Sequence, residues 1–128
     1  MNKVLENLSY AKTHEWVSFV SDTTARIGIS DFAQHELGDL VFINLPEAGD
    51  AITAGDAFGD VESVKAVSDI LSPVTGVISA VNQDVLDHPE SINESPYDSW
   101  FIEVTDITEK SDLMTAFEYG DFCEKEAH

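Results

Sequence analysis

Short runs of apolar residues recur along the chain and are separated by turn-forming residues, a pattern typical of all-β proteins. Apolar and polar positions alternate cleanly over 25–29 and 101–104, so each of these runs is expected to bury one face. The expected strands are Glu15–Val20, Thr24–Ile29, Leu40–Leu45, Ala57–Val61, Val67–Leu71, Val77–Val81 and Trp100–Val104. The pattern therefore predicts a mostly β fold.

Two stretches have a helical pattern instead. Asp31 and Gln34 have the spacing of a capping box and Gly38 provides a stop, so we expect a short helix over 31–37. Between 108 and 125, apolar residues recur roughly one helical turn apart. These residues are Leu113, Met114, Phe117 and Phe122. We expect one or two amphipathic helices there, lying on the sheet.

The chain is strongly acidic, with 25 Asp and Glu against 6 Lys and Arg and a formal net charge of -19. Such a surface repels nucleic acid and anionic lipid, because phosphate binding depends on Lys and Arg. It favours partners with basic docking faces, although acidity can also serve solubility alone. The length of 128 residues and the hydrophobic fraction of 43% fit one domain over 1–128.

Several classes of site and location are not supported by the sequence. Cys123 is the single cysteine, so no internal disulfide and no cysteine-cluster metal site is expected. His14 precedes Glu15 and Trp16 without the second histidine of a zinc helix, so we expect no metal. The chain has neither a long apolar run nor a recognisable targeting segment. We expect a cytoplasmic protein, with the mitochondrial matrix as the alternative.

Lys65 is the only lysine or arginine between Arg26 and Lys110. Two β-type runs flank it, and 62–65 can form a tight turn between them. A lysine at such a tip projects its amine into solvent, where a modifying enzyme can acylate it and extend the side chain. The alternative is an ordinary solubilising lysine on a turn.

The segment 61–69, followed by 72–76, resembles the lipoylation segment of the H proteins of the glycine cleavage system. Other matching motifs occur in the family's order from about Leu8 to Phe122, so the resemblance covers essentially the whole chain. They are Tyr10 with 14–17, 27–31, 33–34, 37–39, 41–42, 45–47, Gly49, 93–97 and Trp100.

The resemblance implies a flattened β sandwich of barrel-sandwich hybrid type that carries lipoate covalently on Lys65 and has no catalytic activity of its own. It implies a cycle with three enzymes. A pyridoxal-phosphate-dependent glycine decarboxylase loads the aminomethyl group of glycine onto the arm, and a tetrahydrofolate-dependent aminomethyltransferase takes it over. Dihydrolipoamide dehydrogenase then reoxidises the arm. We expect a monomer that visits these enzymes in turn.

The resemblance also implies roles for four further residues. Glu62 and Gly49 match positions linked to recognition by the lipoylating enzymes, a lipoate ligase or a lipoyl or octanoyl transferase. Glu15 and Asp69 match positions at which the cationic loaded arm rests. The alternatives are a plain turn glycine at Gly49 and solvated charges at the two acids.

The chain departs from the family at two positions. Glu36 stands where some members have a histidine thought to touch the arm, which puts that contact in doubt. Phe32 replaces another histidine, and an apolar residue there is expected to join the core.

Four alternatives to this function can be compared on the sequence. Biotin carriers usually place the modified lysine between two methionines, and lipoyl domains of 2-oxoacid dehydrogenases usually have Asp before it, whereas Val64 and Ala66 flank Lys65 here. An enzyme using Ser63, Lys65 and Asp69 would lack a histidine base. A lipoyl relay that donates lipoyl groups to other acceptor proteins would use the same lysine.

Overall fold

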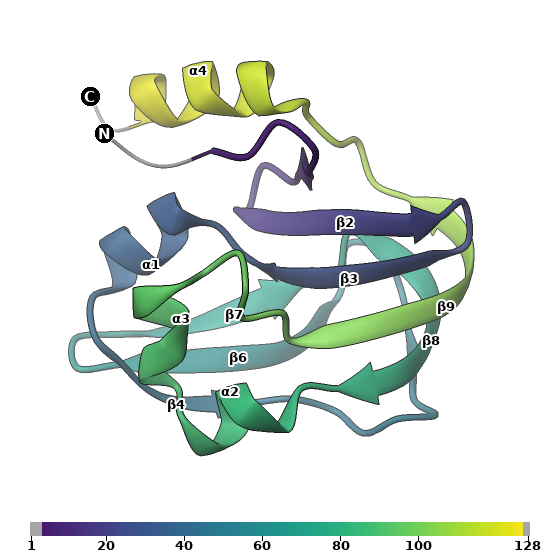
Figure 1. Cartoon of the computed structure of the whole chain (residues 1–128), viewed down its shortest axis with the longest axis horizontal. Coiled ribbons are helices and arrows are strands. Elements are labelled where there is room, and N and C mark those ends of the chain that lie inside the picture. The colour runs from purple at the N-terminus through teal and green to yellow at the C-terminus, as the bar shows by residue number, and fades with distance from the viewer. Residues whose placement is uncertain (1–3, 127–128) are drawn as a thin grey trace.

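The structure is a computed structural model that describes residues 4–126, and two antiparallel sheets stacked face to face form most of it (Figure 1). The larger sheet has the strand order β1-β2-β3-β9-β8-β5. Its strands are β1 (Ser9–Tyr10), β2 (Glu15–Ser21), β3 (Thr24–Ile29), β5 (Ala51–Ile52), β8 (Val74–Val81) and β9 (Ile102–Lys110). The expectation of a mostly β fold is confirmed.

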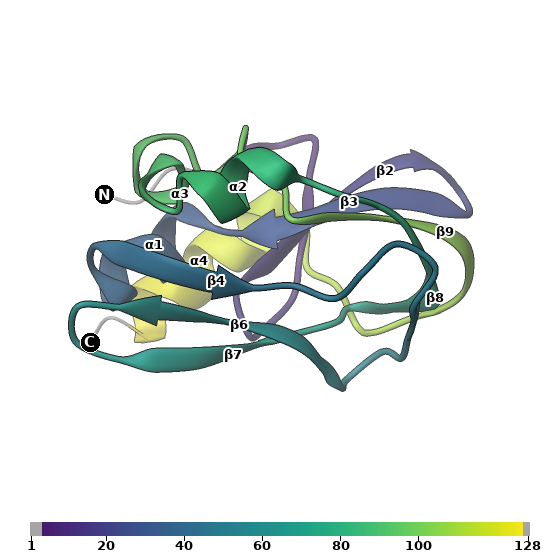
Figure 2. The ribbon, with the colours of Figure 1, turned by 90° about the horizontal axis from the view of Figure 1, so that it is seen from below.

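The smaller sheet consists of β4 (Leu40–Asn44), β6 (Ala57–Ser63) and β7 (Val67–Leu71), with β6 in the middle. Turned by 90°, the molecule shows this sheet as a layer of its own beneath β2, β3 and β9 (Figure 2). Ile43, Val61 and Ile70 point from it into the core, where they meet apolar residues of the larger sheet such as Ile27 and Val104. Burying these side chains is the main force that holds the two sheets together.

Four helices complete the described part of the chain: α1 (Asp31–Leu37), α2 (Gln83–Asp87), α3 (Glu90–Glu94) and α4 (Ala116–Glu126). Helix α4 lies over the N-terminal segment at the top of Figure 1. It closes a second apolar cluster in which Tyr119 and Cys123 of the helix meet Tyr10, Trp16 and Phe32. Phe32 is buried, as expected for this departure from the family.

The expected helix bounds are confirmed for α1 and wrong near the C-terminus. The expected helical stretch 108–125 begins with the last three residues of β9, of which Glu109 and Lys110 lie opposite Thr75 and Val74 of β8. Helix α4 starts later because Thr115 and Glu118 form a capping box, in which each backbone N–H donates to the other's side-chain oxygen. In α1 the capping residue is Ser30 rather than Asp31.

Candidate functional site

Lys65 lies at the tip of the hairpin that joins β6 to β7, and its side chain is exposed. The Ser63 N–H donates to the carbonyl oxygen of Ala66 at 2.8 Å and closes the turn. The Ser63 hydroxyl oxygen accepts the N–H groups of Lys65 at 3.2 Å and of Ala66 at 3.0 Å. This hydroxyl therefore has a structural role in shaping the tip, which explains why a serine stands two residues before the lysine.

The end of α1 supports the lysine turn from the side. Val64 N–H donates to the carbonyl oxygen of Asp39 at 3.0 Å, which joins the hairpin tip to the segment after α1. Gly38 has a φ of +83° and a ψ of -160°, a conformation that is essentially restricted to glycine. A Cβ on Gly38 would lie 3.4 Å from Cε of Lys65, so the lysine stem lies across this glycine.

Asn93 of α3 fixes the conformation of this corner. Its side-chain amide donates to Gln34 Oε1 and to the carbonyl oxygen of Gly38, both at 2.9 Å, and its carbonyl oxygen accepts the N–H of Leu40 at 2.8 Å. The sequence motif contains Asn93, but the sequence alone indicates no role for it. A single asparagine in a polar stretch does not indicate that its side chain will connect the end of α1 to the start of β4.

The structure separates the two residues expected to guide lipoylation. Glu62 pairs with Val67 across the hairpin and lies three residues before Lys65. Gly49 lies beyond the other end of β4, where its N–H donates to the carbonyl oxygen of Ile78 at 2.7 Å. Its φ of +98° requires glycine for the turn itself.

Glu15 is buried, with 2% of its surface exposed, and lies at the wall of an open pocket of about 250 Å³. Thr13 Oγ1 donates to one carboxylate oxygen, and the N–H of Leu71 donates to the other at 3.3 Å. Burial raises the pKa of Glu15 to about 7, because the hydrogen bonds only partly offset the loss of solvent. The pocket lies where β7 ends, beyond the exposed Asp69.

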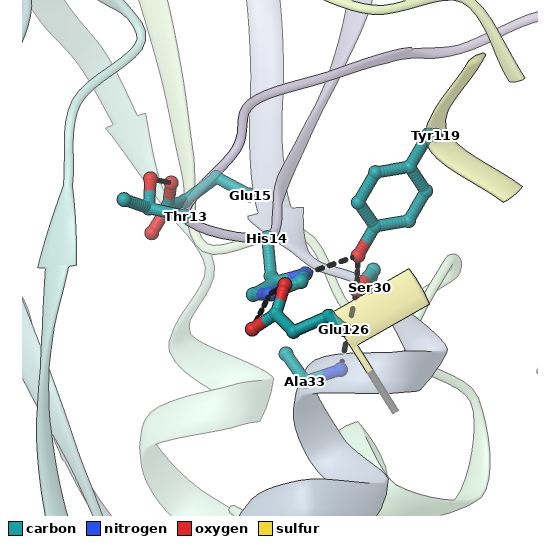
Figure 3. A network of polar contacts seen from close by, with 7 residues as sticks. All are labelled: Thr13, His14, Glu15, Ser30, Ala33, Tyr119 and Glu126. Carbon is teal, nitrogen blue, oxygen red and sulfur yellow. Dashed lines mark hydrogen bonds and ion pairs between the residues drawn. The ribbon is translucent and has the colours of Figure 1, made fainter. Parts of the chain in front are cut away.

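His14, next to Glu15, belongs to a polar network that reaches α4 (Figure 3). Its Nδ1 lies 2.7 Å from the Tyr119 hydroxyl and its Nε2 lies 3.2 Å from the Glu126 carboxylate. The Tyr119 hydroxyl lies 2.5 Å from Ser30 Oγ, which also accepts the N–H of Ala33. His14 has a φ of +78°, and these contacts hold the turn that carries Glu15. No local sequence pattern indicates this network.

Within residues 4–126, no group of three or more His, Cys, Asp or Glu is arranged to hold a metal ion. None of the helices in this part of the chain has the length and apolar character needed to cross a membrane. Glu36, the second departure from the family, is exposed on α1.

Comparisons with known proteins agree on one family. The family model for the glycine cleavage H-protein matches residues 8–126. The glycine cleavage system H protein of Lachnoclostridium phytofermentans is 57% identical over 124 residues, which cover 97% of this chain and 98% of that protein. The corresponding protein of Anoxybacillus flavithermus is 51% identical over 117 residues, covering 89% and 91%.

A solved structure agrees at the level of the fold. The crystal structure of a glycine cleavage system H protein from Mycobacterium marinum superposes with a TM-score of 0.86 at 35% sequence identity. The match covers 98% of this chain and 100% of that one. The likeness therefore extends over both sheets and the helices.

Proposed function

Because this chain belongs to the glycine cleavage H-protein family, whose members carry the aminomethyl group of glycine on a lipoyl arm, we propose that Lys65 is its lipoyl attachment site. The observation that carries this proposal is the position of Lys65, exposed at a hairpin tip whose shape is fixed by the Ser63 hydroxyl. An amine in this position can enter the active site of an acylating enzyme and accept an amide bond.

Three other lysines serve for comparison. Lys110 Nζ lies 4.4 Å from the ring centre of Phe19, and Lys125 pairs with Asp121 at 3.0 Å. Lys12 is exposed in the turn before β2, close to the Glu15 pocket. Each of them is outside the segment that resembles the family's modification segment, so they provide matched controls for Lys65.

The attached group supplies a dithiolane that accepts the aminomethyl group, and the protein supplies reach and docking. We propose that Glu62 helps the lipoylating enzyme to recognise the turn, because it lies three residues before Lys65 on the same hairpin. A role for Gly49 in this recognition would be indirect, through the turn beyond β4. Tethering to Lys65 raises the concentration of the arm at each docked active site.

Glu15 and Asp69 are proposed as the resting place of the loaded arm. An arm on Lys65 must lie along β7 to reach the pocket at the end of that strand, and Asp69 is on β7. A cationic amine in the pocket would favour the ionised form of Glu15, whose pKa burial raises to about 7. The Glu15 carboxylate would thereby gain a cationic partner when the arm is loaded.

The carrier has no catalytic role of its own in this proposal, since the Ser63 hydroxyl is engaged in the turn. Its partners are glycine decarboxylase, the tetrahydrofolate-dependent aminomethyltransferase, dihydrolipoamide dehydrogenase and a lipoylating enzyme. We place it in the cytoplasm, in keeping with the bacterial origin of the relatives compared, as a single-domain monomer that visits each enzyme.

Intact-mass measurement tests the attachment site. Co-expression with lipoate ligase in medium with lipoate should add a single lipoyl-sized increment to the wild type and to Lys110→Arg. The same experiment should add nothing to Lys65→Arg. A biotin-sized increment, or a lipoyl increment that persists in Lys65→Arg, would overturn the proposal.

A further inference from the structure

The hairpin tip that carries Lys65 lies at the same end of the molecule as α1 and α3 (Figures 1 and 2). The N–H groups of Lys65 and Ala66 donate to the Ser63 hydroxyl, within the hairpin. The N–H of Val64 instead donates at 3.0 Å to the carbonyl oxygen of Asp39, which lies between α1 and β4. The direction of the Asp39 carbonyl therefore affects how the tip is held.

The peptide unit between Asp39 and Leu40 is held from both ends. A peptide unit is planar and trans, so its carbonyl and its N–H group point in opposite directions. Its carbonyl end accepts the N–H of Val64, and its N–H end donates at 2.8 Å to the side-chain oxygen of Asn93. Rotation of the unit would break both hydrogen bonds, so Asn93 and the hairpin tip are coupled through it.

The partners of the Asn93 amide fix its orientation. A backbone N–H only donates and a carbonyl only accepts, so the side-chain oxygen must face Leu40 and the NH2 group must face Gly38. The NH2 group also donates at 2.9 Å to Oε1 of Gln34, whose own amide donates at 2.8 Å to Asp31. An ionised aspartate in place of Asn93 could still accept from Leu40, but it would face two further acceptors.

We propose that Asn93 is a positioning residue for the lipoylation of Lys65. It acts through the Asp39–Leu40 peptide unit, by holding the turn in one conformation before the lipoylating enzyme binds. A turn that is already ordered loses less conformational freedom on binding, so less of the binding free energy is offset. The inference rests on the proposed function, since it concerns how Lys65 is presented to that enzyme.

The effect belongs to binding rather than to the acyl transfer. In the transfer, the Lys65 amine attacks the carbonyl carbon of a lipoyl group that is activated as a mixed anhydride with a phosphate. The amide C–N bond forms, the bond from that carbon to the phosphate oxygen breaks, and the amine loses a proton. The turn is ordered both in the enzyme complex and in this step, so the cost of ordering it raises KM and leaves kcat unchanged.

Initial rates of lipoylation test this division. Lipoate ligase with ATP and lipoate is the probe, and the concentration of unlipoylated protein is varied. Asn93→Asp removes both donors of the amide, and the uncharged Asn93→Leu removes all of its hydrogen bonds. Each variant should raise KM for the protein at least about fivefold and leave kcat within about twofold, since ordering one backbone residue already has an effect of this size.

Asn82 offers a matched control. It is half-buried, as Asn93 is, and its side chain donates to the carbonyl oxygen of Trp100 at 2.8 Å and accepts the N–H of Asp84 at 3.1 Å. Neither bond involves the lysine hairpin or the segment 38–40. Asn82→Asp and Asn82→Leu make the same changes of charge and shape, and they should leave KM within about twofold.

Amide hydrogen exchange, followed by NMR, separates positioning from a loss of global stability. The N–H of Ser63 is hydrogen-bonded within the turn, whereas the N–H of Val64 is bonded to Asp39. Asn93→Asp should accelerate exchange at Val64 at least about tenfold more than at Ser63. A purely structural role would accelerate both amides by the same factor, because both would exchange through the same global unfolding.

The possible results lead to different conclusions. An unchanged KM in the folded Asn93 variants, or equal acceleration at Ser63 and Val64, overturns the positioning role, while lipoylation of the wild type at Lys65 still supports the proposed function. A KM that rises as much in the Asn82 variants also overturns it. Gln34→Met, which removes one partner of the amide, is the milder variant if Asn93→Leu unfolds, and it should raise KM in the same direction. A wild type that accepts no lipoyl group overturns the proposed function itself.

Discussion

The aliphatic stem of Lys65 lies across Gly38, where an added Cβ would be 3.4 Å from Lys65 Cε. That distance is an ordinary van der Waals contact, so alanine would fit the space beside the lysine. The φ of +83° at Gly38 nevertheless disfavours any other residue. Glycine is therefore required here mainly by the backbone conformation, and its contact with Lys65 is a secondary reason.

This relationship separates two effects of substitution. Gly38→Ala and Gly55→Ala should each cost roughly 1–3 kcal/mol of unfolding free energy, because both glycines have positive φ. Gly38→Leu should in addition slow lipoylation of the folded protein, since its longer side chain must displace the Lys65 stem. Chemical denaturation and a timed lipoylation assay measure the two effects. Equal lipoylation rates for Gly38→Leu and Gly55→Leu would show that the contact has no effect.

Glu15 should make the protein less stable as pH rises from about 4.5 to 7. Its pKa is raised to about 7 in the folded state from an ordinary value of 4.5, so between these values the folded state binds more protons than the unfolded state. The folded state loses up to about 3 kcal/mol relative to the unfolded one across this window. The penalty is absent below the window and complete above it.

Glu15→Gln provides the measurement for this effect. The unfolding free energy of the variant minus that of the wild type should rise across the window and stay constant above pH 7. The difference, rather than either curve alone, isolates Glu15 from the other carboxylates. A difference that does not change with pH would contradict the raised pKa.

Tyr119→Phe should loosen the attachment of α4. The hydroxyl that lies near both His14 Nδ1 and Ser30 Oγ is buried, and burial raises its pKa, so it acts as a neutral hydrogen-bonding group. Its removal should cost about 1–3 kcal/mol. Glu126→Gln is the control, because Glu126 is 46% exposed and a partly exposed ion pair contributes little. Equal losses of thermal stability in Tyr119→Phe and Glu126→Gln would contradict this role of the Tyr119 hydroxyl.

Much of the fold could be predicted because its signals are local. Strands β3 and β7 have the predicted bounds, since alternation or a short apolar run between turns specifies them. The predicted helix over 108–125 was wrong at its start because long-range pairing with β8 prevailed over a helical spacing of apolar residues. Helices α2 and α3, of five residues each, are too short to show a period.

The site could be predicted only in part. Lys65 is distinguished by its isolation among acidic residues, and the structure places it at the predicted hairpin tip. The contacts of Asn93, His14 and Tyr119 depend on segments far apart in the chain, so no local pattern indicates them. The roles predicted for Glu62, Gly49, Glu15 and Asp69 stay predictions.

Cys123 should resist thiol reagents while the protein is folded. It is 4% exposed on the inner side of α4, and burial raises its pKa, so little reactive thiolate is available. Iodoacetamide should modify it more than about tenfold faster in urea than in buffer. This protection would prevent disulfide exchange between Cys123 and a dithiol arm. Rapid modification of the native protein would contradict it.

Bicarbonate exchange with carboxyl-labelled glycine and the cognate glycine decarboxylase tests the central claim most directly. Lipoylated wild type should support release and exchange of the label, and lipoylated Lys110→Arg should do so equally. Lys65→Arg, treated with the same ligase, should support none. Exchange that is independent of Lys65, or none with the fully lipoylated wild type, would contradict the assignment of this side chain as the carrier of the arm.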